Sequence, residues 1–205
     1  MQLVQTINTG IRRIPSWLLY IVGAAYGGWL FFLALTGGLG FDPIEALEHR
    51  YGKIAFQLLL VGLAVTPLRQ YLGLNLMSWR RAIGVLAFFF LLAHFTVWAV
   101  LDVQRLDAIW ADIVKRPYVT IGMAGFLLLI PLGLTSNNLS VRKMGAAAWR
   151  RLHKLVYPAA LLGALHWVWL AKGFQIEPLI YMAITLCLLA TRLNMPRLRP
   201  QPRRA

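Results

Sequence analysis

Residues 80–98 of the chain, RRAIGVLAFFFLLAHFTVW, decide its fold. Two arginines precede a long apolar run, and His94 lies inside that run. The run predicts a helix that crosses a membrane, because about 20 mostly apolar residues span the hydrocarbon core of a bilayer. An imidazole at such a depth is costly unless a partner engages it.

A second stretch repeats this arrangement. Residues 150–171, RRLHKLVYPAALLGALHWVWLA, place His153 among basic residues and His166 deep in an apolar run. At 1.5 Å of rise per residue, His94 lies about 18 Å beyond Ala82, and His166 lies about 20 Å beyond His153. Two imidazoles at one depth on separate helices predict a shared ligand, for which a haem iron is well suited. The alternative is that each histidine makes an interhelical hydrogen bond.

The composition predicts an all-α membrane protein. The 205 residues are 59% hydrophobic with a mean hydropathy of +0.63, although the net charge is +14. A nucleic-acid partner is excluded because the basic residues fall between apolar runs. Helix is the secondary structure that satisfies its own backbone in lipid. Six spans are expected: Trp17–Thr36, Ile54–Leu68, Ala82–Leu101, Pro117–Thr135, Leu155–Ala171 and Leu179–Leu193.

Charge predicts the orientation of this six-helix bundle. With six crossings, every acidic residue falls on one side, and most of the basic residues fall on the other. The positive-inside rule then places both termini in the cytoplasm. The acids are Asp42, Glu45, Glu48, Asp102, Asp107, Asp112 and Glu177.

The predicted domain organisation is simple. Residues 1–193 form one transmembrane domain, and residues 194–205 form a basic, disordered tail along the anionic inner leaflet. The first span, Trp17–Thr36, is expected to be retained rather than cleaved as a signal peptide, because its apolar core exceeds the usual 7–15 residues. Cys187 is interpreted as a small buried apolar residue.

His153 is the candidate ligand of a second haem. Its distance from His166 suits a haem stacked beneath the first, near the cytoplasmic face. Thirteen residues of regular helix leave the two rings about 140° apart, so a change of phase near Pro158 would be needed. Arg80 and Arg81 lie at the corresponding depth on the other helix. Contact with haem propionates or lipid phosphate is favoured over iron ligation for both arginines, because a guanidinium stays protonated.

Other functional classes find little support. His49 beside Glu45 and Glu48 is expected on a solvated outer loop rather than at a zinc site. Neither a dinucleotide-binding nor a phosphate-binding glycine motif occurs. The predicted spans carry no acid, which argues against proton-coupled transport.

Several motifs together resemble a known family. They are GGLGFDP at 37–43, HRYGKIA at 49–55, TPL at 66–68, RRAIG at 80–84 with His94, RPY at 116–118, and WRRLHKLVY at 149–157 with His166. This ordered set resembles the MsrQ (YedZ) family, the haem-binding membrane subunits of a bacterial periplasmic methionine sulfoxide reductase system. The wider relatives are ferric reductase and NADPH oxidase transmembrane domains.

The resemblance implies a function. It implies a multi-pass b-type cytochrome of the bacterial inner membrane with one or two haems b, whose haem histidines are His94, His153 and His166. It implies electron transfer from the quinone pool or a cytoplasmic flavin reductase to a periplasmic molybdopterin-containing reductase that repairs oxidised proteins. FMN is associated with the family. The chain is then an electron-transfer subunit rather than the catalytic one; a stand-alone ferric or quinone reductase and a haem-free transporter or scaffold subunit are the alternatives.

Overall fold

The computed structural model describes residues 2–171 and 175–193, and every regular element in these ranges is helical. The predicted basic tail, residues 194–205, lies outside the described residues. The helices are α1 (Gln2–Arg13), α2 (Ser16–Leu35), α3 (Pro43–Tyr71), α4 (Arg80–Thr96), the π-helical η1 (Val97–Val103), α5 (Leu106–Lys115), α6 (Pro117–Leu134), α7 (Asn138–Met144), α8 (Ala146–Leu152), the 3₁₀ turn η2 (His153–Leu155), α9 (Val156–Leu170) and α10 (Ile176–Leu193).

Five of the described helices are long and apolar enough to cross a membrane. They are α2, α3, α4 with its continuation η1, α6 and α10. The other predicted span corresponds to α9, which has 15 residues and therefore rises only about 22 Å. α8 and η2 precede α9 directly and extend the helical path on its N-terminal side.

Helix α3 is much longer than the predicted span Ile54–Leu68. Asp42 caps it by accepting a hydrogen bond from the backbone N–H of Glu45 at 3.1 Å, and Pro43 occupies its first turn. The helix therefore starts about three turns before the apolar run, through a charged stretch that hydropathy alone does not assign to a helix. The prediction that His49 lies on an outer loop is wrong, because His49 is an exposed residue of α3.

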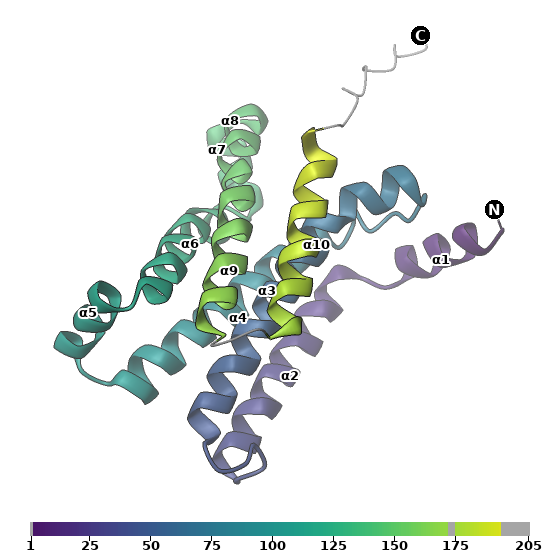
Figure 1. The fold of residues 1–205 in the computed structure, drawn as a ribbon. Helices are drawn as coiled ribbons and strands as arrows, with labels where there is room; N and C mark the ends of the chain where they lie inside the picture. The colour runs from purple at the N-terminus through teal and green to yellow at the C-terminus, as the bar shows by residue number, and fades with distance from the viewer. Residues whose placement is uncertain (1, 172–174, 194–205) are drawn as a thin grey trace.

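The bundle is built from two helix pairs. Helix α3 packs along α4, and α6 packs along α9, while α10 covers α9 and α3 (Figure 1). Polar contacts fix α10 to α3: Lys53 pairs with Glu177 at 2.5 Å, and Gln57 donates to the Tyr181 hydroxyl at 2.6 Å. Such interhelical contacts are typical of membrane bundles, where apolar burial adds little between helices already in lipid.

Helix α2 joins the first pair through a close approach at a glycine. The Tyr51 hydroxyl donates to the Gly27 carbonyl at 2.7 Å, and a Cβ at Gly27 would lie 3.4 Å from the ring of Phe90. Leu30, Leu47, Tyr51 and Phe90 are almost fully buried around this contact. The first three spans therefore share one core.

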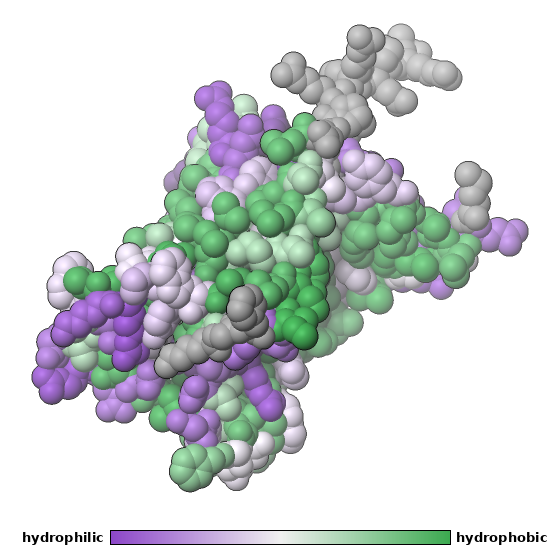
Figure 2. All heavy atoms as spheres, in the orientation of Figure 1, coloured by the Kyte–Doolittle hydropathy of each residue, from purple (hydrophilic) through white to green (hydrophobic). Residues whose placement is uncertain are grey.

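The surface has the polarity of a membrane protein. Figure 2 shows an apolar band over α9 and α10, with hydrophilic atoms over α7 and α8 above it and over α5 below it. Cys187 lies on α10 and is exposed, so the interpretation of a buried cysteine is wrong. Its apolar setting in the sequence reflects a surface within the hydrophobic band rather than the protein core.

Candidate functional site

A cavity of about 1530 Å³ lies between the two helix pairs. Residues from α3, α4, α6 and α9 line it, and it runs from His94 and His166 to His153, Arg80 and Arg81. Along α4 the distance from Arg80 to His94 corresponds to about 21 Å of helix rise. We call the end at His94 and His166 the paired-histidine end, and the end at His153, Arg80 and Arg81 the basic end.

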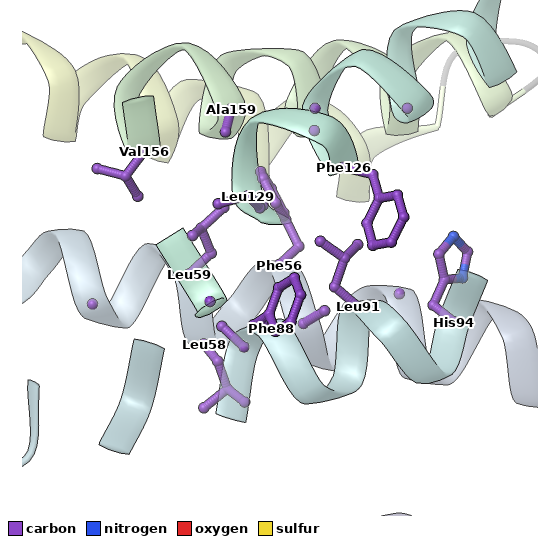
Figure 3. A pocket seen from close by; sticks show the side chains of 18 of the residues that line it. Phe56, Leu58, Leu59, Phe88, Leu91, His94, Phe126, Leu129, Val156 and Ala159 are labelled. Atoms are coloured by element: carbon purple, nitrogen blue, oxygen red, sulfur yellow. The ribbon is translucent and has the colours of Figure 1, made fainter. Parts of the chain in front are cut away.

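The middle of the cavity is apolar. Figure 3 shows Phe56, Leu91, Phe126 and Leu129 around it, with His94 at one side. These side chains offer a dry wall to a flat, largely apolar ligand. The volume exceeds the range of about 300–1,000 Å³ that is common for small-molecule sites, so a macrocycle with bulky substituents can be accommodated.

His94 is held by the helix next to its own. Its Nδ1 lies 2.9 Å from the backbone carbonyl oxygen of Glu48 on α3. A carbonyl oxygen only accepts, so Nδ1 carries the proton and donates. The ring rests against Gly52, where a Cβ would come within 3.0 Å of Nδ1.

His166 is held in the same way in the other helix pair. Its Nδ1 donates to the backbone carbonyl of Tyr118 on α6 at 2.7 Å. A Cβ at Gly122 would come within 2.8 Å of this nitrogen. Each imidazole of the paired-histidine end therefore donates Nδ1–H to a main-chain carbonyl of its partner helix.

This pattern prepares both histidines for a metal. A neutral imidazole with its proton on Nδ1 has its lone pair on Nε2, which is the common metal-binding nitrogen. Metal-bound histidines generally donate their second nitrogen to a carbonyl or carboxylate, which fixes the tautomer and the ring orientation. The donor chemistry and the apolar walls thus fit a haem, which His94 and His166 would hold through their Nε2 atoms.

His153, at the basic end, is held differently. Its Nε2 lies 3.2 Å from the Thr135 hydroxyl, which itself donates to the Pro131 carbonyl at 2.6 Å. Nε2 is therefore the donor, and the lone pair is on Nδ1. The ring stacks on Trp149, with 3.8 Å between the ring centroids. Burial, followed by the positive charge of Arg80, lowers the pKa of His153, which favours the neutral ring.

The other residues of the basic end are cationic. Arg80 and Arg81 line the cavity together with Arg150 and Lys154. Arg81 donates to the Asn138 side chain at 2.6 Å, which fixes its guanidinium between α4 and α7. Within the part of the chain that the structure describes, no acidic residue lines this end, so its chemistry suits a carboxylate or a phosphate.

The structure therefore brings the sequence-predicted site residues to one cavity, although at two separate ends. Among the described residues, no group of three His, Cys, Asp and Glu side chains is placed to hold a metal ion, and this includes the surroundings of His49. Sequence reasoning missed the residues that seat the ligands: the carbonyls of Glu48 and Tyr118, with Gly52 and Gly122 one turn later. A signal was available for Gly122, which lies on the predicted span Pro117–Thr135, whereas Gly52 precedes the predicted span Ile54–Leu68 and lies in the part of α3 that hydropathy missed.

Comparison with known proteins agrees with this architecture. Residues 51–164 match the family model described as a ferric reductase like transmembrane component, which defines the class of protein. A relative from Agrobacterium fabrum is 47% identical over 188 residues, covering 91% of this chain and 87% of its own length. A relative from Brucella ovis is 48% identical over 184 residues, covering 89% of this chain and 83% of its own length.

Both relatives are named the heme-binding subunit MsrQ of protein-methionine-sulfoxide reductase. The chain therefore belongs to the MsrQ family, within the ferric reductase-like transmembrane proteins.

Proposed function

We propose that this chain is a b-type cytochrome that binds haem at the paired-histidine end and serves a methionine sulfoxide reductase as its membrane electron-transfer subunit. The names of its relatives support the assignment. The observation that carries it is the matched pair of imidazoles, His94 and His166, which line one cavity and both donate Nδ1–H to a main-chain carbonyl.

Each residue of this site has a defined task in the proposal. His94 and His166 supply one Nε2 each to the iron, and the carbonyls of Glu48 and Tyr118 keep both rings in the required tautomer. Phe126 and Leu91 exclude water from the cavity wall. The haem, when bound, supplies one-electron redox chemistry.

The basic end is proposed as a second, asymmetric site. His153 supplies an imidazole there, while Arg80 and Arg81 supply cationic partners for haem propionates. Binding of iron by His153 through Nε2 requires that the hydrogen bond to Thr135 be given up. The same cations suit a donor that carries a phosphate or a quinone headgroup, and electrons are proposed to enter at this end.

The proposed topology has six spans, with α9 as the sixth, and both termini on the cytoplasmic side of the bacterial inner membrane. The charge distribution supports it, because the basic end faces one surface while Glu45, Asp102 and Glu177 line the cavity at the other. Electrons would then leave beside His94 and His166, where the acidic rim of the cavity can guide a periplasmic catalytic subunit.

The decisive experiment is the absorbance spectrum of the purified protein. A Soret band with the α and β bands of a low-spin, bis-histidine haem is expected, together with reoxidation of the reduced pigment by the catalytic subunit. A protein that remains folded but colourless after haem is supplied would contradict the proposal. Reoxidation by ferric chelate but not by the catalytic subunit would instead identify a stand-alone ferric reductase.

A further inference from the structure

The two proposed ligands, His94 and His166, contact their neighbouring helices in the same way, and their spacing in the sequence does not explain this. His94 donates to the carbonyl of Glu48, and its ring lies against Gly52 four residues later. His166 donates to the carbonyl of Tyr118, and its ring lies against Gly122, again four residues later. The two helix pairs thus build the same arrangement independently, with the carbonyl and the glycine on one helix and the histidine on its neighbour.

Helix geometry explains the interval of four. The carbonyl of a helical residue accepts the N–H of the residue four positions later, so one of its two lone pairs is used. Side chains lean toward the N-terminus of their helix, so the Cβ of that later residue lies over the turn that contains the carbonyl. A glycine at this position leaves the second lone pair open to a donor from a neighbouring helix.

We infer that Gly52 and Gly122 are positioning residues for the haem ligands: they admit the imidazoles to the Glu48 and Tyr118 carbonyls, and so set the electron donation from His94 and His166 to the iron. This inference rests on the proposed haem ligation. It adds that the reduction potential depends on two glycines that touch the ligands rather than the metal.

A methyl group added at either glycine tests directly whether the glycine is needed to position the imidazole. At Gly122 a Cβ would lie 2.8 Å from Nδ1 of His166, which is too close for any stable contact. At Gly52 the corresponding distance to Nδ1 of His94 is 3.0 Å, so the effect there is smaller. The ring must shift, and the Nδ1–H bond to the carbonyl is lengthened or lost. A ligand without this bond is a weaker base and stabilises ferric iron less, so the reduction potential rises.

Two other glycines provide matched controls. Gly125 lies on α6 with Gly122, and a Cβ there would meet the Cβ of Leu162 at an ordinary 3.4 Å. Gly62 lies on α3 with Gly52, and a Cβ there would meet only Ile83, at 3.8 Å. Both controls line the cavity, so they report the effect of a methyl group on a ligand in the cavity without touching either imidazole.

The experiment compares Gly122→Ala and Gly52→Ala with Gly125→Ala and Gly62→Ala in the full-length protein. Haem affinity, the low-spin electron paramagnetic resonance g values and the midpoint potential are measured in each variant. The first two variants are expected to bind haem about 10–100-fold more weakly, as is typical for loss of a partner of a metal ligand. Their g values should shift and their potentials should rise, with the larger change at Gly122.

The results separate this inference from the proposed function. Wild-type g values and potentials in Gly122→Ala and Gly52→Ala would overturn the inference, while loss of haem in His166→Ala would still support the ligation. Changes of equal size in the Gly125 and Gly62 variants would also overturn it, because any methyl group in the cavity would then act alike. Retention of haem in His94→Ala and His166→Ala would contradict the proposed function itself.

A further measurement needs no methyl group and covers the case in which the alanine variants fail to fold. In His166→Gly, added imidazole and 1-methylimidazole compete for the vacated position on the iron. Only imidazole carries a second N–H for the Tyr118 carbonyl, so it is expected to bind about 2- to 12-fold more tightly, the equivalent of one hydrogen bond. Equal affinities after correction for the intrinsic basicity of the two bases would overturn the inference.

Discussion

At the paired-histidine end of the cavity, His94 and His166 donate Nδ1–H to main-chain carbonyls, whereas at the basic end His153 uses Nε2 on the hydroxyl of Thr135. A carbonyl in a helix is a rigid acceptor that fixes one tautomer. A threonine hydroxyl can rotate and can donate as well as accept. Histidines that line one cavity therefore differ in whether the Nε2 lone pair is free to bind a metal. The hydrogen-bond partner of each ring determines this difference.

The largest expected effect comes from removing either member of the pair. His94→Ala and His166→Ala should each abolish the low-spin spectrum of the paired-histidine end, because one remaining imidazole cannot complete the ligation. The pyridine haemochrome assay and electron paramagnetic resonance measure this loss. His49→Ala is the control for loss of an imidazole from the cavity wall, since His49 is an exposed residue of α3 that also lines the cavity. An unchanged spectrum in both ligand variants would contradict haem ligation by His94 and His166, and the two ends of the cavity would then not differ in metal binding.

Substitution at the basic end should have a smaller and separable effect. His153→Ala is expected to remove the second haem and to leave the g values of the first unchanged. Thr135→Val should instead raise the occupancy of the second haem site. The substitution releases Nε2 of His153 from its hydrogen bond and makes that nitrogen available to iron. Haem content per protein distinguishes the variants. A content unaffected by His153→Ala would assign His153 to packing against Trp149 and Thr135.

The cations of the basic end should act on the electron donor rather than on the first haem. Arg80→Gln is expected to raise the KM for reduced FMN about tenfold, which corresponds to one charge-assisted hydrogen bond, with little change in kcat. Arg142→Gln, which removes an exposed charge of α7 outside the cavity, should have no such effect. Stopped-flow reduction at several donor concentrations gives both constants. Equal responses of the two variants would mean that general surface charge governs reduction.

The sequence predicts the helical membrane fold and places an apolar run on each of the five described helices long enough to cross a membrane, because apolar runs report burial in lipid directly. It misses the start of α3, since the charged turn that contains Glu45, Glu48 and His49 is held in helix by the Asp42 cap and not by hydropathy. The connecting helices α5, α7 and α8 are too short to give a clear apolar pattern.

The candidate site was predictable only in part. The matched depths of His94 and His166 in their spans predicted that the two rings lie close together. Both residues line the same cavity. The hydrogen bonds that distinguish them from His153 depend on main-chain carbonyls, which every residue carries and no sequence motif marks. Only the glycines at 52 and 122 leave a trace of these contacts in the sequence, and a glycine in a membrane span has many other uses.

The smallest predicted effect concerns the acidic rim beside the paired-histidine end. Glu45 and Asp102 line the cavity there, whereas Asp107 lies away from it and is already paired with Arg105 at 2.6 Å. If the rim guides the catalytic subunit, electron delivery should slow about threefold between roughly 0.05 and 0.5 M salt, because rim charges act mainly on the rate of encounter.

Joint substitution Glu45→Gln and Asp102→Asn should flatten this salt dependence, and Asp107→Asn should preserve it. The salt dependence of haem reoxidation by the catalytic subunit, measured by stopped flow, distinguishes these outcomes. A rate independent of salt in the unmodified protein would show that docking relies on uncharged contacts, and the electrostatic contrast between the two ends would then concern the donor alone.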